Sequence, residues 1–310
     1  MLTYRRSAPA FLALLLCAIL VGHAPVTRAG ASDMQPRAYT PIVMGPGSTV
    51  PPVPPSSMPT DWLGRVNYYR AVAGVSPVTT DAGLDANCVE HARYMAENNH
   101  LTHNQDPSKP YASAAGQICA GKGNAWIGSG TSWTDADAVD GWMSSVGHRL
   151  WMIYPTTPVF GYGFYTAANR EAAALDVLSR TNMGADTSYS GWPVRYPVAG
   201  QTSIPASRYP ITLMWRYFGS APQIISTSLR TESGTAIAHA ADTNLPAGHK
   251  GVQIVPAANL PDSTVFVVEV AGTYGGAPFS YSWRFSTGDT PLAGKSVPEA
   301  VAELGEPREP

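Results

Sequence analysis

The spacing of apolar residues changes near Thr187, and this change limits the possible folds more than any other feature of the sequence. Upstream of it, apolar side chains recur at intervals of three and four residues, as they do in amphipathic helices. Downstream, short apolar runs alternate with Gly, Pro and Asn turns, which is the pattern of a β-sandwich. We therefore expect an α+β domain over 60–187 and an all-β domain over 188–287.

Within the first domain, the pattern predicts helices and a strand pair. The predicted elements are helices at 61–73, 81–98 and 134–147, and paired strands at 159–166 and 172–178. Asp61, Asp81 and Thr134 stand where a helix cap is needed. The polar, Gly-rich residues 104–134 are expected to form a loop.

In the second domain the pattern predicts short strands only. The predicted strands are 211–218, 223–229, 236–240, 251–255, 264–270 and 279–285. Residues 288–310 are rich in Pro and Glu and are expected to be a disordered tail.

The first 31 residues have the features of an export signal. Arg5 and Arg6 precede a 12-residue apolar run, and the small residues at 29–31 form a cleavage site. The run is too short for a comfortable membrane span, although an uncut signal anchor is the alternative. No later segment is apolar enough to cross a bilayer. We expect a secreted chain that begins with an extended leader over 32–59, where eight residues are Pro.

Removal of the signal leaves two cysteines, Cys88 and Cys119. An exported chain enters an oxidising compartment, so we expect these two residues to form a disulfide. Such a bond would stabilise the fold by about 3–4 kcal/mol in the chain-entropy treatment. Two separately buried thiols are the alternative.

The charge of the chain argues against nucleic acid as a partner. The formal net charge is −2, only 14% of the residues are charged, and there is no run of basic residues. A mildly acidic chain has no electrostatic attraction to phosphates or to anionic lipids.

Five ordered blocks between residues 60 and 180 carry a family resemblance. They are Asn67-x-x-Arg70 with Gly74-Val75-x-Pro77-Val78, Leu84-x-x-x-Cys88-x-x-His91-Ala92-x-x-Met95-Ala96, Leu101-Thr102-His103, Trp142-Met143-x-Ser145-x-Gly147-His148-Arg149, and Pro155 with Gly161-Tyr162-Gly163. In this order they resemble the CAP superfamily of cysteine-rich secretory proteins, antigen 5 and pathogenesis-related proteins, in its bacterial form. The resemblance implies an α-β-α sandwich.

The resemblance also implies a site. Many family members place two His and two Glu around one cavity, where they can hold a divalent ion such as Zn²⁺. His103 and His148 match the two His, whereas Gln117 and Ser145 stand at the two Glu positions. We therefore expect these four residues to line a ligand cleft, with no metal cofactor and no catalytic residue.

Two alternatives to this site remain open. His103 and His148 could still bind Zn²⁺ if Asp106, Asp137 or Asp140 completed the ligand set. Ser144, His148 and Asp140 imitate a catalytic triad, but three residues from one helix end seldom provide the orientation and the oxyanion hole that a triad needs. His91 is expected to be a core histidine with its hydrogen bonds satisfied.

The second domain resembles the immunoglobulin-like modules of bacterial surface proteins. The resemblance lies in residues 256–264, the strand 265–270 and the aromatic strand that ends in Phe285-Ser286-Thr287. Such modules act as spacers or adhesive units.

These observations favour a binding protein over an enzyme. We expect an extracellular bacterial protein whose CAP cleft binds a small apolar or amphipathic molecule or a surface polymer. The family resemblance implies sterol and lipid binding. One alternative is a metal-dependent hydrolase of peptides or cell-wall material, and another is an adhesion protein that acts through its second domain.

Overall fold

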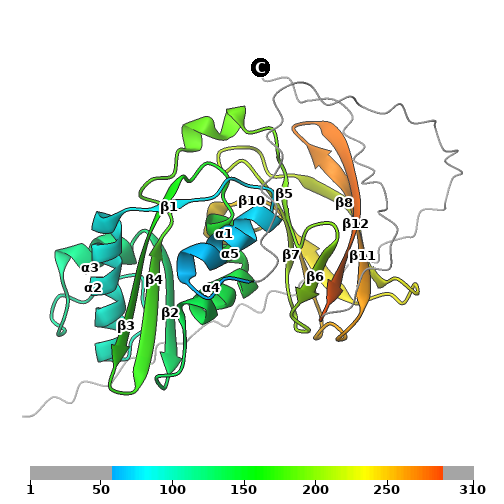
Figure 1. Cartoon of the computed structure of the whole chain (residues 1–310). Helices are drawn as coiled ribbons and strands as arrows, with labels where there is room; N and C mark the ends of the chain where they lie inside the picture. Colours follow the sequence, from blue (N-terminus) through cyan, green and yellow to red (C-terminus); the bar gives the residue numbers. More distant parts are fainter. Residues whose placement is uncertain (1–57, 289–310) are drawn as a thin grey trace, which may run out of the picture. The chain divides into compact units, whose positions relative to one another are not determined.

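The described part of the chain is residues 58–288 of a computed structural model (Figure 1). The expected signal peptide, nearly all of the expected leader and the expected tail lie outside these residues. The elements up to residue 176 are α1 (Trp62–Val72), β1 (Thr79–Thr80), α2 (Ala82–Asn98), α3 (Ala114–Ala120), β2 (Gly123–Ser129), α4 (Asp135–Ser144), α5 (Val146–Met152), β3 (Val159–Ala167) and β4 (Arg170–Asp176).

The first two helices begin at the predicted caps. The Asp61 side chain accepts a hydrogen bond from the backbone N–H of Gly64, and Asp81 accepts from those of Gly83 and Leu84. A capped first turn fixes the helix start because it satisfies N–H groups that have no partner inside the helix.

The prediction of a loop over 104–134 is wrong, because this stretch contains α3 and β2. Ser113 caps α3 by accepting from the N–H of Gly116. β2 pairs with β4 along its whole length, and a Cβ at Gly123 would lie only 1.7 Å from the Leu175 carbonyl oxygen. The glycine that weakens the strand pattern is therefore what lets β2 approach its partner.

The predicted single helix over 134–147 is also wrong at its end. Thr134 and Asp137 form a capping box that starts α4, but the helix breaks at Ser145. Ser145 is extended (φ −105°, ψ 129°) and occupies the C-cap position of α4 and the N-cap position of α5, without a side-chain cap hydrogen bond to α5. α5 then continues to Met152.

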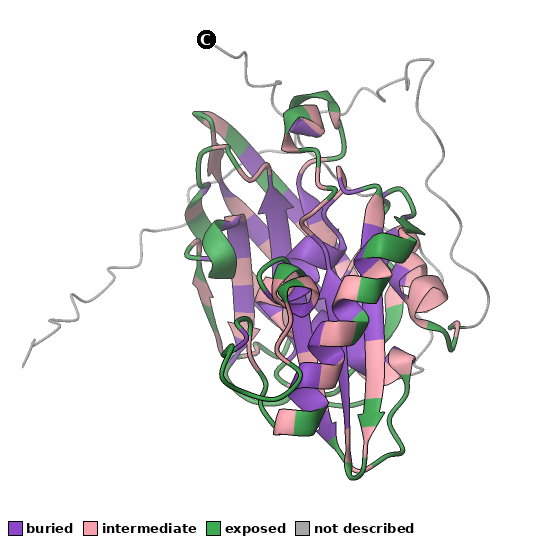
Figure 2. Cartoon of the chain, turned by 90° about the vertical axis from the view of Figure 1, so that its left-hand side faces the viewer, coloured by how far each residue is buried: buried purple, intermediate pink, exposed green. Residues whose placement is uncertain are grey.

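The four strands form a sheet in the order β1-β3-β4-β2, in which β1 and β3 are parallel and the other pairs are antiparallel. Helices α2 and α3 lie on one face, and α1, α4 and α5 lie on the other (Figure 1). Figure 2 looks onto the first face and shows buried residues concentrated on the strands.

The central strand β4 is apolar toward both faces of the sheet, so both faces need a helical cover. Ala172 and Ala174 belong to the core beneath α2 and α3, whereas Ala173 and Leu175 belong to the core beneath the other helices. Successive side chains of a strand point to opposite faces, so a strand buried on both faces is apolar without alternation.

The C-terminal region consists of two four-stranded sheets, in the orders β5-β7-β10-β9 and β6-β12-β11-β8. The strands are β5 (Val194–Tyr196), β6 (Gln201–Ile204), β7 (Ile211–Trp215), β8 (Gln223–Thr231), β9 (His239–Asp242), β10 (Lys250–Pro256), β11 (Val265–Tyr274) and β12 (Ala277–Thr287), with 3-10 turns η1 (Met183–Ser188) and η2 (Pro246–Gly248). Five of the six predicted strands are present with shifted ends, whereas the strand predicted at 236–240 overlaps β9 only at 239–240. β5 and β6 were not predicted because they have only three and four residues.

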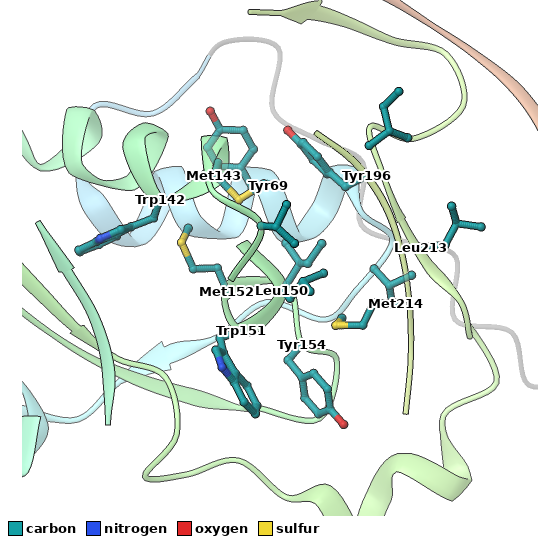
Figure 3. Close-up of a cluster of buried hydrophobic side chains, with 14 of the residues drawn as sticks. Tyr69, Trp142, Met143, Leu150, Trp151, Met152, Tyr154, Tyr196, Leu213 and Met214 are labelled. Atoms are coloured by element: carbon teal, nitrogen blue, oxygen red, sulfur yellow. The ribbon is translucent and has the colours of Figure 1, made fainter. Parts of the chain in front are cut away.

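The largest buried cluster extends from the first region into the second. Figure 3 shows Leu150, Trp151 and Tyr154 of the helical side near Tyr196 and Met214 of the β region. Among residues 58–288, no helix is long and apolar enough to span a membrane.

Candidate functional site

His103 and His148 come together although 45 residues separate them in the sequence. Their ring centroids are 6.2 Å apart and the rings are inclined by 29°. His103 lies in the exposed loop after α2, and His148 lies on α5, half-buried. The structure thus places side by side the two histidines that the sequence singled out.

Ser145 holds the ring of His148. The Ser145 Oγ lies 3.1 Å from the His148 Nδ1, and the Asn124 amide donates to the His148 carbonyl oxygen at 3.2 Å. Burial, and to a lesser degree the nearby His103, lower the pKa of His148 below its ordinary value. Since that ordinary value is about 6.5, His148 is neutral at pH 7.

Gln117 holds the loop that carries His103. Its Oε1 accepts a hydrogen bond of 2.7 Å from the backbone N–H of Gln105, two residues beyond His103. The amide oxygen of Gln117 therefore bonds to the backbone of this loop.

Gln105 is a site residue that the sequence did not reveal. Its side chain is 5% exposed; Nε2 lies 3.2 Å from the His91 Nδ1, and Oε1 accepts from the backbone N–H of Ser113 at 2.8 Å. The one feature of the sequence that relates to this role of Gln105 is Gly116, because a Cβ at that position would lie 2.3 Å from the Gln105 Nε2. Glycine at this position leaves the space that the Gln105 amide fills.

His91 is a buried histidine with both nitrogens bonded, as predicted. Its Nε2 lies 3.0 Å from the Thr102 carbonyl oxygen, so Nε2 donates and Nδ1 accepts from Gln105. Burial lowers the pKa of His91 to about 4. The neutral ring of His91 therefore supports the loop that carries His103, through its hydrogen bond to the Thr102 carbonyl oxygen.

The acids that were considered as further metal ligands have other partners. Asp106 accepts from Ser108, and Asp137 accepts from Thr134 at the start of α4. Asp140 accepts from the Tyr69 hydroxyl at 2.8 Å. In the described part of the chain, no three His, Cys, Asp or Glu residues are grouped so that they can hold a metal ion.

The donor set therefore does not fit the zinc centre that the family resemblance implies. Such a centre uses two imidazoles and two anionic oxygens, but the amide of Gln117 and the hydroxyl of Ser145 are neutral. Both groups also already have hydrogen-bond partners.

The triad-like spacing of Asp140, Ser144 and His148 does not produce a triad. The Ser144 hydroxyl donates to the Gly141 carbonyl oxygen at 2.6 Å, and the His148 Nδ1 faces Ser145. Asp140 lies with Tyr69 rather than with an imidazole. A base oriented by an acid, which nucleophilic catalysis needs, is not formed by these residues.

The disulfide joins the two helices that support the His103 loop. Cys88 of α2 and Cys119 of α3 are bonded, as predicted. Cys119 follows Gln117 by two residues, so the cross-link fixes the helix from which Gln117 reaches the loop.

A mixed sheet between two helical layers, with one disulfide and a histidine pair, defines the first region as a small α+β domain. Residues 63–177 match the CAP family, described as the cysteine-rich secretory protein family, and this part of the chain is a CAP domain.

Other comparisons add little to this assignment. A search of curated proteins gives no match. Among solved structures, the chain is similar to an outer surface protein from Borrelia burgdorferi, with 14% identity over 36% of this chain and 86% of that chain and a TM-score of 0.27.

Proposed function

We propose that this protein binds a small amphipathic molecule with a neutral polar head at the His103–His148 site. The absence of carboxylates from the site, together with the lowered pKa of His148, carries the proposal. His148 is uncharged at pH 7, and an amide and a hydroxyl stand where the CAP resemblance would place carboxylates. Imidazole nitrogens can donate to or accept from a hydroxyl head group, and no fixed charge has to be compensated.

Two exposed apolar residues close in sequence to the site residues support an amphipathic ligand. Leu101 is 53% exposed and precedes His103 by two residues, and Ile118 is 50% exposed and follows Gln117 directly. Covering such side chains with the apolar part of a ligand is favourable by roughly 25 cal/mol per Å². The affinity then comes from the apolar part and the orientation from the histidines.

We infer that the protein acts outside the cell and that its second region is an immunoglobulin-like spacer. The N-terminal export signal, the disulfide and the secretory character of the CAP family support the location. The paired four-stranded sheets and the order of aromatic residues in β12 support the spacer.

The test is a titration of the purified protein with 1-decanol, followed by NMR of the histidine ring resonances. We expect the signals of His103 and His148 to shift in a saturable way while that of exposed His100 stays constant. His148→Ala should weaken binding, His100→Ala should not, and decanoate should bind less tightly than the alcohol. Native mass spectrometry of the protein as purified should show a bound neutral amphiphile.

Two outcomes would overturn the proposal. One is that neither His103 nor His148 responds to 1-decanol. The other is that only a soluble cell-wall polymer moves these signals, in which case the site serves a polymer and not an amphiphile.

A further inference from the structure

Helix α5 takes part in the site and also in the contact with the β region. His148 and Arg149 are neighbours on α5, but His148 faces His103 whereas Arg149 is fully buried. Two more contacts lie along the same helix. A Cβ at Gly147 would lie 3.1 Å from the Pro246 Cβ, and the Trp151 ring centroid is 4.2 Å from that of His249.

Arg149 connects three parts of the chain. Its Nε donates to the Met143 carbonyl oxygen and its Nη1 donates to the Pro210 carbonyl oxygen, each at 2.6 Å. Its guanidinium carbon lies 5.0 Å from the Tyr196 ring centroid and 4.5 Å from that of Tyr209. A buried guanidinium with carbonyl and aromatic partners has its direction fixed by the planar fork of its donors.

The contact with Met143 matters because Met143 lies near the end of α4, just before the break at Ser145. The Tyr209 hydroxyl donates to the same carbonyl oxygen at 3.0 Å. Arg149 on α5 and Tyr209 of the β region therefore both bind the last turn of α4, through the same carbonyl oxygen. Ser145 is the residue at this break, and its Oγ lies 3.1 Å from the Nδ1 of His148 in the first turn of α5.

We propose that Arg149 is the positioning residue of the site: anchored on Pro210 and Tyr209, it fixes the α4–α5 break so that His148 meets Ser145 and faces His103. The β region then has a role beyond that of a spacer, since it determines the geometry of the CAP site. The proposal rests on the proposed function only in treating the histidine pair as a ligand site.

The experiment measures the pKa of His148 by histidine-ring NMR in the purified protein, without ligand. The variants are Arg149→Lys, which can keep one of the two carbonyl bonds, and Tyr209→Phe, which keeps the ring but loses the hydroxyl. Loosening the break admits water to His148, so we expect its pKa to rise toward the ordinary value of about 6.5 in both variants. The pKa of His91, which lies on α2, should not change.

A matched control separates positioning from general loss of stability. Val268→Ala truncates a fully buried side chain in β11, which belongs to the sheet that does not contain β7, and should leave the pKa of His148 unchanged. The proposal is overturned if folded Arg149→Lys and Tyr209→Phe both titrate as the wild type does, or if Val268→Ala shifts His148 as much as they do.

Binding of 1-decanol gives a second measurement. We expect Tyr209→Phe to weaken it about tenfold, because a site held too loosely loses affinity. If the wild type does not bind 1-decanol, the proposed function fails, while the pKa of His148 still decides whether Arg149 positions the ring.

Discussion

Gln105 shows how much of this site depends on one neutral side chain. It joins the His103 loop to α2 through His91 and to α3 through Ser113, and its own N–H is held by Gln117. All these partners are uncharged at neutral pH, so the loop is held without an ion pair. A buried amide with both ends bonded gives geometric specificity because each lost bond leaves a polar group unsatisfied.

Gln105→Leu should therefore destabilise the protein. The substitution keeps the size of the side chain but leaves the His91 Nδ1 and the Ser113 N–H without partners, which should lower the free energy of unfolding by about 2 kcal/mol. Urea unfolding measures the change. Asn104→Ala, at the exposed neighbouring position, is the control and should stay within about 0.5 kcal/mol of the wild type. Equal unfolding midpoints for Gln105→Leu and the control would contradict this role.

The metal affinity of the site should depend on its two missing carboxylates. We expect the wild type to bind no stoichiometric Zn²⁺ at neutral pH, and Gln117→Glu with Ser145→Glu to create or strengthen binding by adding two negative charges. Any affinity should fall as the pH drops below the ordinary imidazole value of about 6.5 and His148 takes up a proton. Calorimetric titration tests this. A one-to-one wild-type site of micromolar affinity that His148→Ala abolishes would restore the hydrolase alternative.

At the scale of the elements, the sequence predicted those with a strong local pattern and missed those without one. The capped helices α1 and α2 and the pair β3–β4 follow from local spacing and caps. α3 and β2 were missed because a short helix and a Gly-rich strand have weak local patterns and depend on tertiary partners. The break at Ser145, and with it the positions of the site residues, depends on contacts with distant segments and has no local signal.

The contact between α2 and β3 should not tolerate a side chain at Gly163. A Cβ there would lie 2.1 Å from the Val89 backbone nitrogen and 2.2 Å from the Cys88 carbonyl carbon. These are backbone atoms of a helix and cannot move aside alone, so Gly163→Ala should lower the free energy of unfolding by about 3 kcal/mol or more. The control is Gly121→Ala, whose Cβ would meet its nearest atom at 3.7 Å. Thermal or urea unfolding should show a large loss for the first variant and a change within about 1 kcal/mol for the second.

At the scale of the whole molecule, the change of pattern near Thr187 indicated two regions but not how closely they associate. The sequence suggested separate cores, whereas one buried cluster contains Trp151 and Tyr154 as well as Tyr196 and Met214. Apolar periodicity shows which face of an element is buried, but not which other element covers it. The boundary at 187/188 and the immunoglobulin-like identity of the second region therefore remain proposals.

Separate expression tests that boundary. Fragments 60–185 and 188–288 should each unfold cooperatively, because each contains a complete sheet system. Each should be less stable than in the whole chain, since part of the shared apolar cluster becomes exposed. Urea unfolding monitored by tryptophan fluorescence measures both. Fragments without a cooperative transition, beside a whole chain with a single one, would place the boundary elsewhere.

The last prediction concerns His249, which lies where α5 meets the β region. It is 2% exposed, and its ring centroid lies 4.2 Å from that of Trp151 and 5.5 Å from that of Tyr217. In the described structure neither of its nitrogens has a hydrogen-bond partner. Burial, and secondarily the charge of Lys250, lower the pKa of His249 to about 3.

The sign of the pH effect follows from this depressed pKa. Between the unfolded value of about 6.5 and the folded value, the unfolded chain binds a proton that the folded protein rejects. The stability is therefore fully present above about pH 6.5 and is lost as the pH falls toward the folded pKa. His249→Phe removes this loss and also the cost of two unpaired buried nitrogens, which is about 1 kcal/mol at neutral pH. The free energy of unfolding of the variant should then exceed that of the wild type by up to about 1.4 kcal/mol more for each pH unit below 6.5.

Urea unfolding at a series of pH values from neutral to mildly acidic measures this difference. Both proteins should lose stability in acid because buried His91 has a depressed pKa as well, but the wild type should lose more. His100→Phe removes an exposed histidine and should follow the wild type. If the curves of His249→Phe and the wild type run parallel, the imidazole takes up its proton equally in the folded and the unfolded chain, and the junction of α5 with the β region is open to water.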